Sequence, residues 1–256
     1  MAMIFVAITP FILSFLFDSF GYSAKLLALA GAYFCIHGFY LTNSRGGFLG
    51  LIAVLFTYIY FKFKSKIGIL AGVLLCIFLF FAAAPSRMHI IDDPQESTRG
   101  RIVAWYSALG MIRYHNPLFG VGKGQFIHYN RVIAHNAFVQ QVGETGLVGA
   151  FFWLGFIYVT VKGIAEVFRK EGVEKSRRAI YRSYLIGLVG LLTVTMFISA
   201  DHELWYVWMA FCSSIIVLEE VKVCFKLRDM FYIGLLEIMF ILVVYGAVVV
   251  FENIYV

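Results

Sequence analysis

The chain has 256 residues, of which 61% are hydrophobic and only 14% are charged. Soluble domains are about half apolar and a quarter charged, so this composition excludes an ordinary soluble protein and indicates an integral membrane protein. The net charge of +6 is explained by lysines and arginines that gather in cytoplasmic loops, so we expect no nucleic-acid partner.

The apolar residues form about eight runs, many of them close to the roughly 20 residues that cross a bilayer as a helix. In chain order, the predicted membrane helices cover residues 2–17, 22–41, 48–61, 67–84, 147–161, 184–200, 204–221 and 230–250. The pattern predicts an all-α fold, a polytopic bundle of about eight transmembrane helices. We expect a single membrane domain over residues 1–256.

Residues 85–146 form the one long polar stretch, and they are too rich in aromatic residues to be disordered by composition. Within it, the segment Thr98–Tyr114 has helical periodicity and predicts an amphipathic helix on or near the membrane surface. Its apolar stripe consists of Ile102, Trp105, Leu109 and Ile112. Asn116-Pro117 ends this helix, a glycine-rich turn at 120–124 follows, and a helix carrying His135 comes next.

Basic residues fix the expected orientation of the chain. The loops at 62–66, 162–183 and 222–229 are rich in lysine and arginine and alternate correctly as cytoplasmic loops. The loops at 42–47, 85–146 and 201–203 then lie outside. We therefore expect the polar chemistry to collect on the outer face, which makes residues 85–146 a periplasmic loop.

His135 and Asn136 stand at the head of a helical pattern, where the polar loop gives way to a membrane helix. A lone histidine here often does no more than cap or pack against the helix. Histidine is also the side chain best suited to exchange a proton near neutral pH, so His135 is a candidate general base. The histidines lack metal-ligand spacing, so we expect neither a metal site nor a cofactor.

Three arginines are candidates for binding an anion. Arg45 lies at the outer end of a membrane segment, where it either reaches to the interface or binds a phosphate with its planar guanidinium. Arg99 and Arg101 come at the start of the amphipathic helix, where cations oppose the helix dipole. They are either ordinary solvated residues or partners of an anionic ligand.

Several of these segments resemble one known family, the O-antigen ligases and O-antigen polymerases of the bacterial envelope. Its helix motif Arg-x-x-x-Trp resembles Arg101 to Trp105, and its turn Pro-Leu-Phe-Gly-Val-Gly resembles residues 117–122. Its motif His-Asn-x9-Gly-x-x-Gly resembles residues 135–149, and its motif Ser-Arg-Gly resembles residues 44–46. The resemblance covers roughly residues 40–220. Family members usually have several more membrane segments ahead of Ser-Arg-Gly, so the chain is expected to be short at its N-terminal end.

The resemblance implies a glycosyltransferase in the bacterial inner membrane whose site faces the periplasm. Such an enzyme moves a glycan from undecaprenyl diphosphate to a hydroxyl of lipid A-core or of another glycan. The family's histidine falls on His135 as catalytic base, and its diphosphate-binding arginines fall on Arg45 and Arg101. Arg99 and Asn136 are further substrate-binding candidates. The resemblance implies neither a metal nor a cofactor, because fixed arginines can stabilise the leaving diphosphate.

Three alternatives to a ligase stay open, and one of them is an enzyme of the same family that glycosylates proteins. A polymerase of the same family shares the donor chemistry and differs only in its acceptor. A non-enzymatic transporter of lipid-linked glycans would place paired charges near the bilayer midplane. The predicted membrane runs are almost free of such charges, with Glu237 as the main exception.

Overall fold

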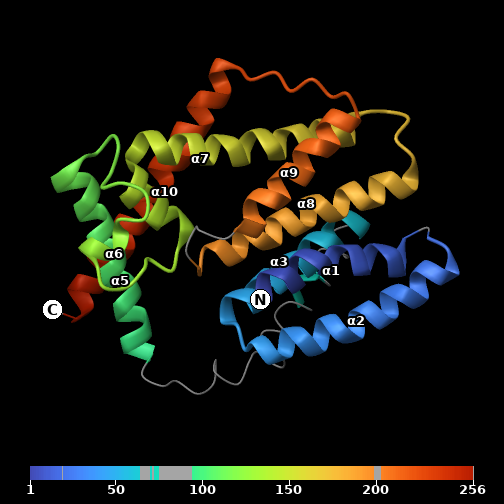
Figure 1. Cartoon of the computed structure of the whole chain (residues 1–256), viewed down its shortest axis with the longest axis horizontal. Coiled ribbons are helices and arrows are strands. Elements are labelled where there is room, and N and C mark those ends of the chain that lie inside the picture. The colour runs from blue at the N-terminus through green and yellow to red at the C-terminus, as the bar shows by residue number, and fades with distance from the viewer. Residues whose placement is uncertain (19, 64–69, 71, 75–93, 199–202, 256) are drawn as a thin grey trace. The chain divides into compact units, whose positions relative to one another are not determined.

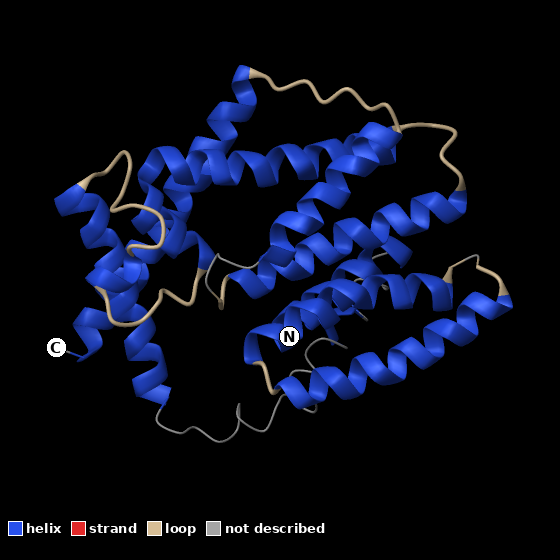
Figure 2. Ribbon diagram, in the orientation of Figure 1, coloured by secondary structure: helices blue, strands red, loops and turns tan. Residues whose placement is uncertain are grey.

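The computed structural model describes residues 1–18, 20–63, 70, 72–74, 94–198 and 203–255. All the regular structure among these residues is helical, as the fold class predicted (Figure 2). The helices, of which Figure 1 labels all but η2, are α1 (Ala2–Phe17), α2 (Tyr22–Thr42), α3 (Arg45–Phe63), α5 (Pro94–Gly110), the π-helix η2 (Met111–His115), α6 (Phe126–Tyr129), α7 (Ala137–Arg169), α8 (Lys175–Thr195), α9 (Glu203–Leu218) and α10 (Leu227–Tyr255).

Four of the described helices are long and apolar enough to cross a membrane, namely α2, α3, α7 and the Leu227–Phe251 part of α10. Helices α1 and α9 are apolar but shorter, and α8 begins with a run of basic residues. The predicted run at 67–84 falls almost entirely outside the described residues. The chain is therefore a multi-pass membrane protein, and the number of about eight spans stays a prediction.

The described residues divide into two compact units. The first comprises Met1–Asp92, Gly163–Val194 and Glu203–Val221, and the second comprises Asp93–Lys162, Thr195–His202 and Lys222–Val256. In the first unit, small residues let α3 and α8 approach closely. A Cβ on Gly50 would lie 2.4 Å from Val194 Cγ2, and one on Gly190 would lie 2.5 Å from Val54 Cγ2.

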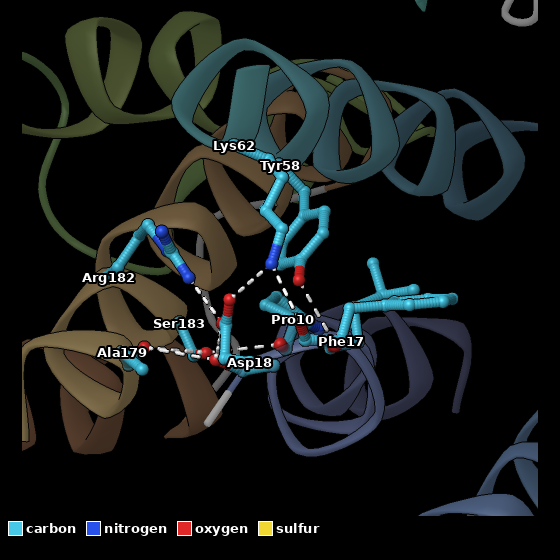
Figure 3. Close-up of polar contacts among 10 residues, drawn as sticks. Pro10, Phe17, Asp18, Tyr58, Lys62, Ala179, Arg182 and Ser183 are labelled. Carbon is cyan, nitrogen blue, oxygen red and sulfur yellow. Dashed lines mark hydrogen bonds and ion pairs between the residues drawn. The ribbon is translucent and has the colours of Figure 1, made fainter. Parts of the chain in front are cut away.

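A partly buried ion cluster joins the residue after α1 to the last turn of α3 and to the first half of α8 in the first unit (Figure 3). Asp18, which follows α1, accepts hydrogen bonds from Lys62 at 2.7 Å, from Ser14 at 2.7 Å and from Arg182. Burial by itself raises the pKa of Asp18, but these hydrogen bonds outweigh it and hold the pKa below its ordinary value. Lys62 and Arg45 lie at opposite ends of α3. The ion cluster, which has one acidic and two basic residues and is called the basic cluster below, therefore lies about 25 Å from Arg45 along the helix.

In the second unit, α10 runs antiparallel to α7. The two helices meet at Lys162 and Asp229, whose charged atoms are 2.6 Å apart, and again at Phe138 and Phe240, whose ring centroids are 4.5 Å apart. The buried core combines small and large apolar residues from α5, η2, α6, α7 and α10, together with Ala134 just before α7. Its members are Ala104, Ala108, Met111, Phe126, Ala134, Val139 and Val244.

Two details of the predicted amphipathic helix were wrong. The helix begins at Pro94, not at Thr98, because proline is well suited to the first helical position. Its buried stripe is Ala104, Ala108 and Met111, one position away from the predicted one, and the bulkier Trp105 and Leu109 pack at the edge. Small residues face the core because they allow α7 and α10 to come close.

Candidate functional site

The segment that carries His135 is tied to α5 by two side chains. Trp105 Nε1 donates a hydrogen bond to the carbonyl oxygen of Ala134 at 3.1 Å. Ser107 Oγ lies 3.4 Å from Asn130 Oδ1, and the Asn130 amide donates to the carbonyl oxygen of Val132 at 2.6 Å. The loop before α7 is therefore held in place against the helix, and its position does not depend on His135 itself.

His135 lies just before α7 and not on it, which corrects the predicted helix start. Asn136 is the N-cap, because its Oδ1 accepts hydrogen bonds from the backbone N–H groups of Phe138 and Val139 at 3.0 and 3.1 Å. His135 adopts a left-handed backbone conformation with φ of +49°. Such a conformation costs about 1–2 kcal/mol for most residues and is often retained at functional sites.

Arg101 influences His135 through its charge. It lies one helical turn before Trp105 on α5, so the residue that anchors Ala134 also brings Arg101 to the histidine. The pKa of the half-buried His135 is lowered, first by burial and then by the positive charge of Arg101. His135 is therefore neutral at neutral pH, the state in which an imidazole accepts a proton.

The other predicted site residues occupy different settings. Arg99 is exposed and lies inside α5 rather than before it. The dipole argument for Arg99 and Arg101 therefore loses force, because the effect fades beyond the first turn. Asn136 is buried, and its side-chain oxygen is engaged as the cap of α7. Arg45 belongs to the first unit, where it is exposed as the first residue of α3, directly after Ser44, whose Oγ accepts from Gly47 N at 3.1 Å.

Helix α7 is broken at Gly146, whose φ of 65° and ψ of −168° are not helical. A break frees carbonyls in the turn before it and N–H groups in the turn after it. The loop at 117–122 satisfies both sets. Its four backbone hydrogen bonds join Val121 N to Gly143 O at 3.2 Å, Gly122 N to Glu144 O at 2.8 Å, Leu147 N to Pro117 O at 2.9 Å and Val148 N to Leu118 O at 3.1 Å.

Two glycines make this interlock possible. A Cβ on Gly120 would lie 2.6 Å from the carbonyl oxygen of Glu144, and a Cβ on Gly146 would lie 2.5 Å from the carbonyl oxygen of Leu118. Neither position therefore accepts a side chain. The turn at 117–122 and the broken helix α7 are thus held together by backbone hydrogen bonds, and we call this arrangement the interlock. The interlock fixes the helix that begins at the candidate site.

The sequence reasoning missed a buried carboxylate beside this interlock. Glu144 is only 1% exposed, accepts a hydrogen bond from Gln140 Nε2 at 3.1 Å and pairs with Lys123 Nζ at 3.3 Å. The pair joins the glycine-rich turn to the first half of α7. No pattern in the sequence signals it, because the two residues lie in different elements. In the ranges that the structure describes, no group of three or more His, Cys, Asp or Glu side chains could hold a metal ion.

These features define a multi-pass helical membrane protein in which a polar loop and a broken helix hold a neutral histidine beside an arginine. Residues 30–154 match the family described as O-antigen ligase, and the matched segment contains Arg45, Arg99, Arg101, His135 and Asn136. The resemblance found in the sequence is thereby confirmed over this segment, which makes up just under half of the chain. Comparison with curated proteins and with solved structures gave no match.

Trp105→Phe tests how the histidine is anchored. The change keeps an aromatic side chain but replaces the indole with the smaller phenyl ring and removes the donor to Ala134 O. It should destabilise this region by about 1–3 kcal/mol because a buried carbonyl loses its partner. We expect faster amide hydrogen exchange across residues 130–139. Trp208→Phe is the matched control in the first unit, since Trp208 Nε1 donates to Tyr184 O at 3.0 Å. Equal exchange at 130–139 in the two variants would contradict this anchoring.

Proposed function

We propose that the protein is a glycosyltransferase of the O-antigen ligase type. It moves a glycan from undecaprenyl diphosphate to an acceptor hydroxyl, with lipid A-core as the acceptor. The observation that carries this proposal is the neutral, half-buried His135 under the charge of Arg101, inside the segment that matches the family.

The proposed reaction is a single displacement at the anomeric carbon of the donor. The acceptor hydroxyl oxygen attacks that carbon, the bond to the diphosphate oxygen breaks, and undecaprenyl diphosphate leaves with the bonding pair. His135 takes the hydroxyl proton as general base. Arg101 stabilises the charge that builds on the leaving diphosphate, so that the reaction proceeds without a divalent metal. Arg45 is retained as a proposed phosphate-binding residue of the first unit. Arg99 adds positive charge along the same helix, and Asn136 positions the histidine as the cap of α7.

The proposed topology places about eight spans of one domain, residues 1–256, in the bacterial inner membrane with the site facing the periplasm. The positions of basic residues along two helices support this topology. Arg45 lies at the end of α3 opposite the basic cluster of Lys62, Asp18 and Arg182. His135 precedes α7, and Lys162 lies near the other end of that helix, paired with Asp229. Basic residues favour the cytoplasmic side, so Arg45 and His135 both belong outside.

A polymerase of the same family would use the same base and arginines with a growing glycan as its acceptor. A transporter is the other alternative, and Glu237 is the feature that favours it, because it is buried within α10 and its Oε1 has no hydrogen-bond partner among the described residues. The products of the transfer reaction distinguish a ligase from a polymerase and from a transporter.

A transfer assay in proteoliposomes tests the proposal. The purified chain receives an undecaprenyl-diphosphate-linked repeat together with either lipid A-core or a second lipid-linked repeat. We expect the glycan on lipid A-core. Products of two or more joined repeats would make the protein a polymerase. Movement of the donor across the bilayer without any new glycosidic bond would overturn the enzymatic proposal in favour of a transporter.

Arg101→Lys tests the proposed diphosphate contact. Lysine keeps the charge but cannot form a bidentate contact with phosphate, so transfer should fall by about 10–100-fold, the equivalent of one charged hydrogen bond of roughly 1.5–3 kcal/mol. Arg131→Lys, at an exposed position of the same loop, should transfer normally. Equal rates for Arg101→Lys and the unaltered chain would remove Arg101 from the donor site.

A further inference from the structure

A second polar feature of the second unit lies along α5, away from His135. A pocket with a volume of about 460 Å³ opens between the end of α5, the π-helix and the C-terminal part of α10. Its lining includes Tyr106, Arg113, Tyr114, Pro117 and Tyr245. The wall formed by α10 lies outside the segment that matches the family, and no role proposed above uses this pocket.

The π-helix at Met111–His115 shapes the pocket. Its wider turn buries Met111 in the core and leaves Arg113 and Tyr114 exposed on the pocket side. Single π turns inside helices are rare and occur frequently at functional sites. Here the turn comes immediately before Asn116 and Pro117, so the pocket borders the loop that locks α7.

The lining residues offer the groups that bind a carbohydrate. The tyrosines at 106, 114 and 245 are 55%, 69% and 56% exposed, and none of their hydroxyls forms a hydrogen bond within the described part of the chain. Aromatic faces carry negative potential and attract the polarised C–H groups of a sugar ring. The guanidinium of Arg113 lies 5.2 Å from the ring centroid of Tyr114 and has no carboxylate partner among the described residues. It can donate to sugar hydroxyls or to an anionic substituent.

We propose that this pocket binds the saccharide of the acceptor. The proposal rests on the proposed function, and it adds a place for the acceptor to the donor site around Arg101 and His135. Tyr106 and Arg113 follow Arg101 on the same helical segment, roughly 8–18 Å further along at about 1.5 Å per residue. A short oligosaccharide covers that distance, so an acceptor held at Arg113 and Tyr114 can extend its terminal hydroxyl towards His135.

Membrane lipid is the competing occupant, because tyrosines also gather at the interface of a bilayer. The two occupants have different requirements. A lipid headgroup would bring a phosphate to Arg113 and would need neither exposed ring faces nor free hydroxyls on three tyrosines. A saccharide uses all of them, and the mixed lining of the pocket therefore favours the saccharide.

Binding of a soluble core oligosaccharide, measured by calorimetry on the full chain in nanodiscs without donor, tests the proposal. We expect Tyr114→Ala and Arg113→Gln each to raise the dissociation constant about tenfold or more, whereas Tyr40→Ala in the first unit should bind normally. Tyr114→Phe keeps the ring but loses the hydroxyl, so it should raise the dissociation constant less than Tyr114→Ala does.

The outcomes separate this proposal from the proposed function. Pocket-dependent binding in a chain that shows no transfer would retain the saccharide site and reject the glycosyltransferase. Transfer whose acceptor KM is unaffected by Tyr114→Ala and Arg113→Gln would retain the enzyme and reject the pocket. Affinity that follows the anionic lipid content of the nanodisc, or displacement by inorganic phosphate alone, would assign the pocket to a headgroup and overturn the proposal.

Discussion

Replacement of His135 by asparagine is expected to lower glycan transfer by about 10²–10⁴-fold, the range that a general base contributes. Asparagine tolerates the left-handed backbone conformation that His135 adopts, so the variant keeps the local fold. It cannot accept a proton near neutral pH. The transfer assay with lipid-linked donor and lipid A-core measures the loss, and thermal unfolding in detergent confirms that the fold remains.

The pH dependence gives the same assignment a second test. A base acts only when neutral, and both burial and Arg101 lower the pKa of His135 from 6.5. Activity should therefore persist below that pH and fall only as the pH drops through the lowered pKa. Arg101→Gln removes one of the two causes, so its residual activity should begin to fall at a higher pH. An unchanged acid limb in that variant would contradict the coupling between the two residues.

His128 provides the matched control, because it lies in the same loop but is exposed at the end of α6. His128→Asn should transfer glycan at the normal rate and with the normal pH profile. Loss of activity in both histidine variants, with equal loss of thermal stability, would show that the loop needs its histidines for structure. Normal transfer in His135→Asn would remove the base from the proposed reaction.

The sequence predicted helices better than helix ends. The runs at 22–41 and 230–250 correspond to α2 and α10, because long apolar stretches have no alternative in a membrane. The ends extend further than the apolar runs, as when α3 begins at Arg45 and includes Lys62. Polar residues at a helix end remain helical when their charged groups reach out of the membrane.

The sequence identified residues of the candidate site but not their arrangement in space. The motifs pointed to His135 and Arg101, and the structure brings both to one place in the second unit. The preference of asparagine for N-caps could have placed His135 ahead of its helix, a signal that was missed. The pairing of Glu144 with Lys123 and the pocket beside the π-helix could not be predicted, because both depend on which faces of distant elements meet.

Gly146→Ala is expected to have the largest effect on the fold. The backbone of Gly146 occupies a region that is essentially restricted to glycine, and the added Cβ would lie 2.5 Å from the carbonyl carbon and oxygen of Leu118. Backbone strain of about 1–3 kcal/mol then adds to overpacking of about 1–3 kcal/mol. The loop at 117–122 must move away, and its hydrogen bonds to the two halves of α7 are lost.

Gly124→Ala separates these two causes. Gly124 also has a positive φ, of +76°, but a Cβ at this position would meet no atom within 4 Å. It should therefore lose only the conformational term, about 1–2 kcal/mol. The difference between the two variants in apparent unfolding temperature measures the interlock itself. Equal decreases in apparent unfolding temperature would mean that the loop at 117–122 moves away from α7 without loss of stability.

The interlock also links stability to activity. Val121 and Gly122 hold the half of α7 whose first turn follows His135 and Asn136, so a displaced loop releases the end of the helix on which the base is positioned. Gly146→Ala should therefore transfer far less glycan than Gly124→Ala, even at temperatures where both remain folded. Faster hydrogen exchange at residues 137–145 should accompany this loss. Normal transfer with fast exchange there would show that the base is positioned by Trp105 alone.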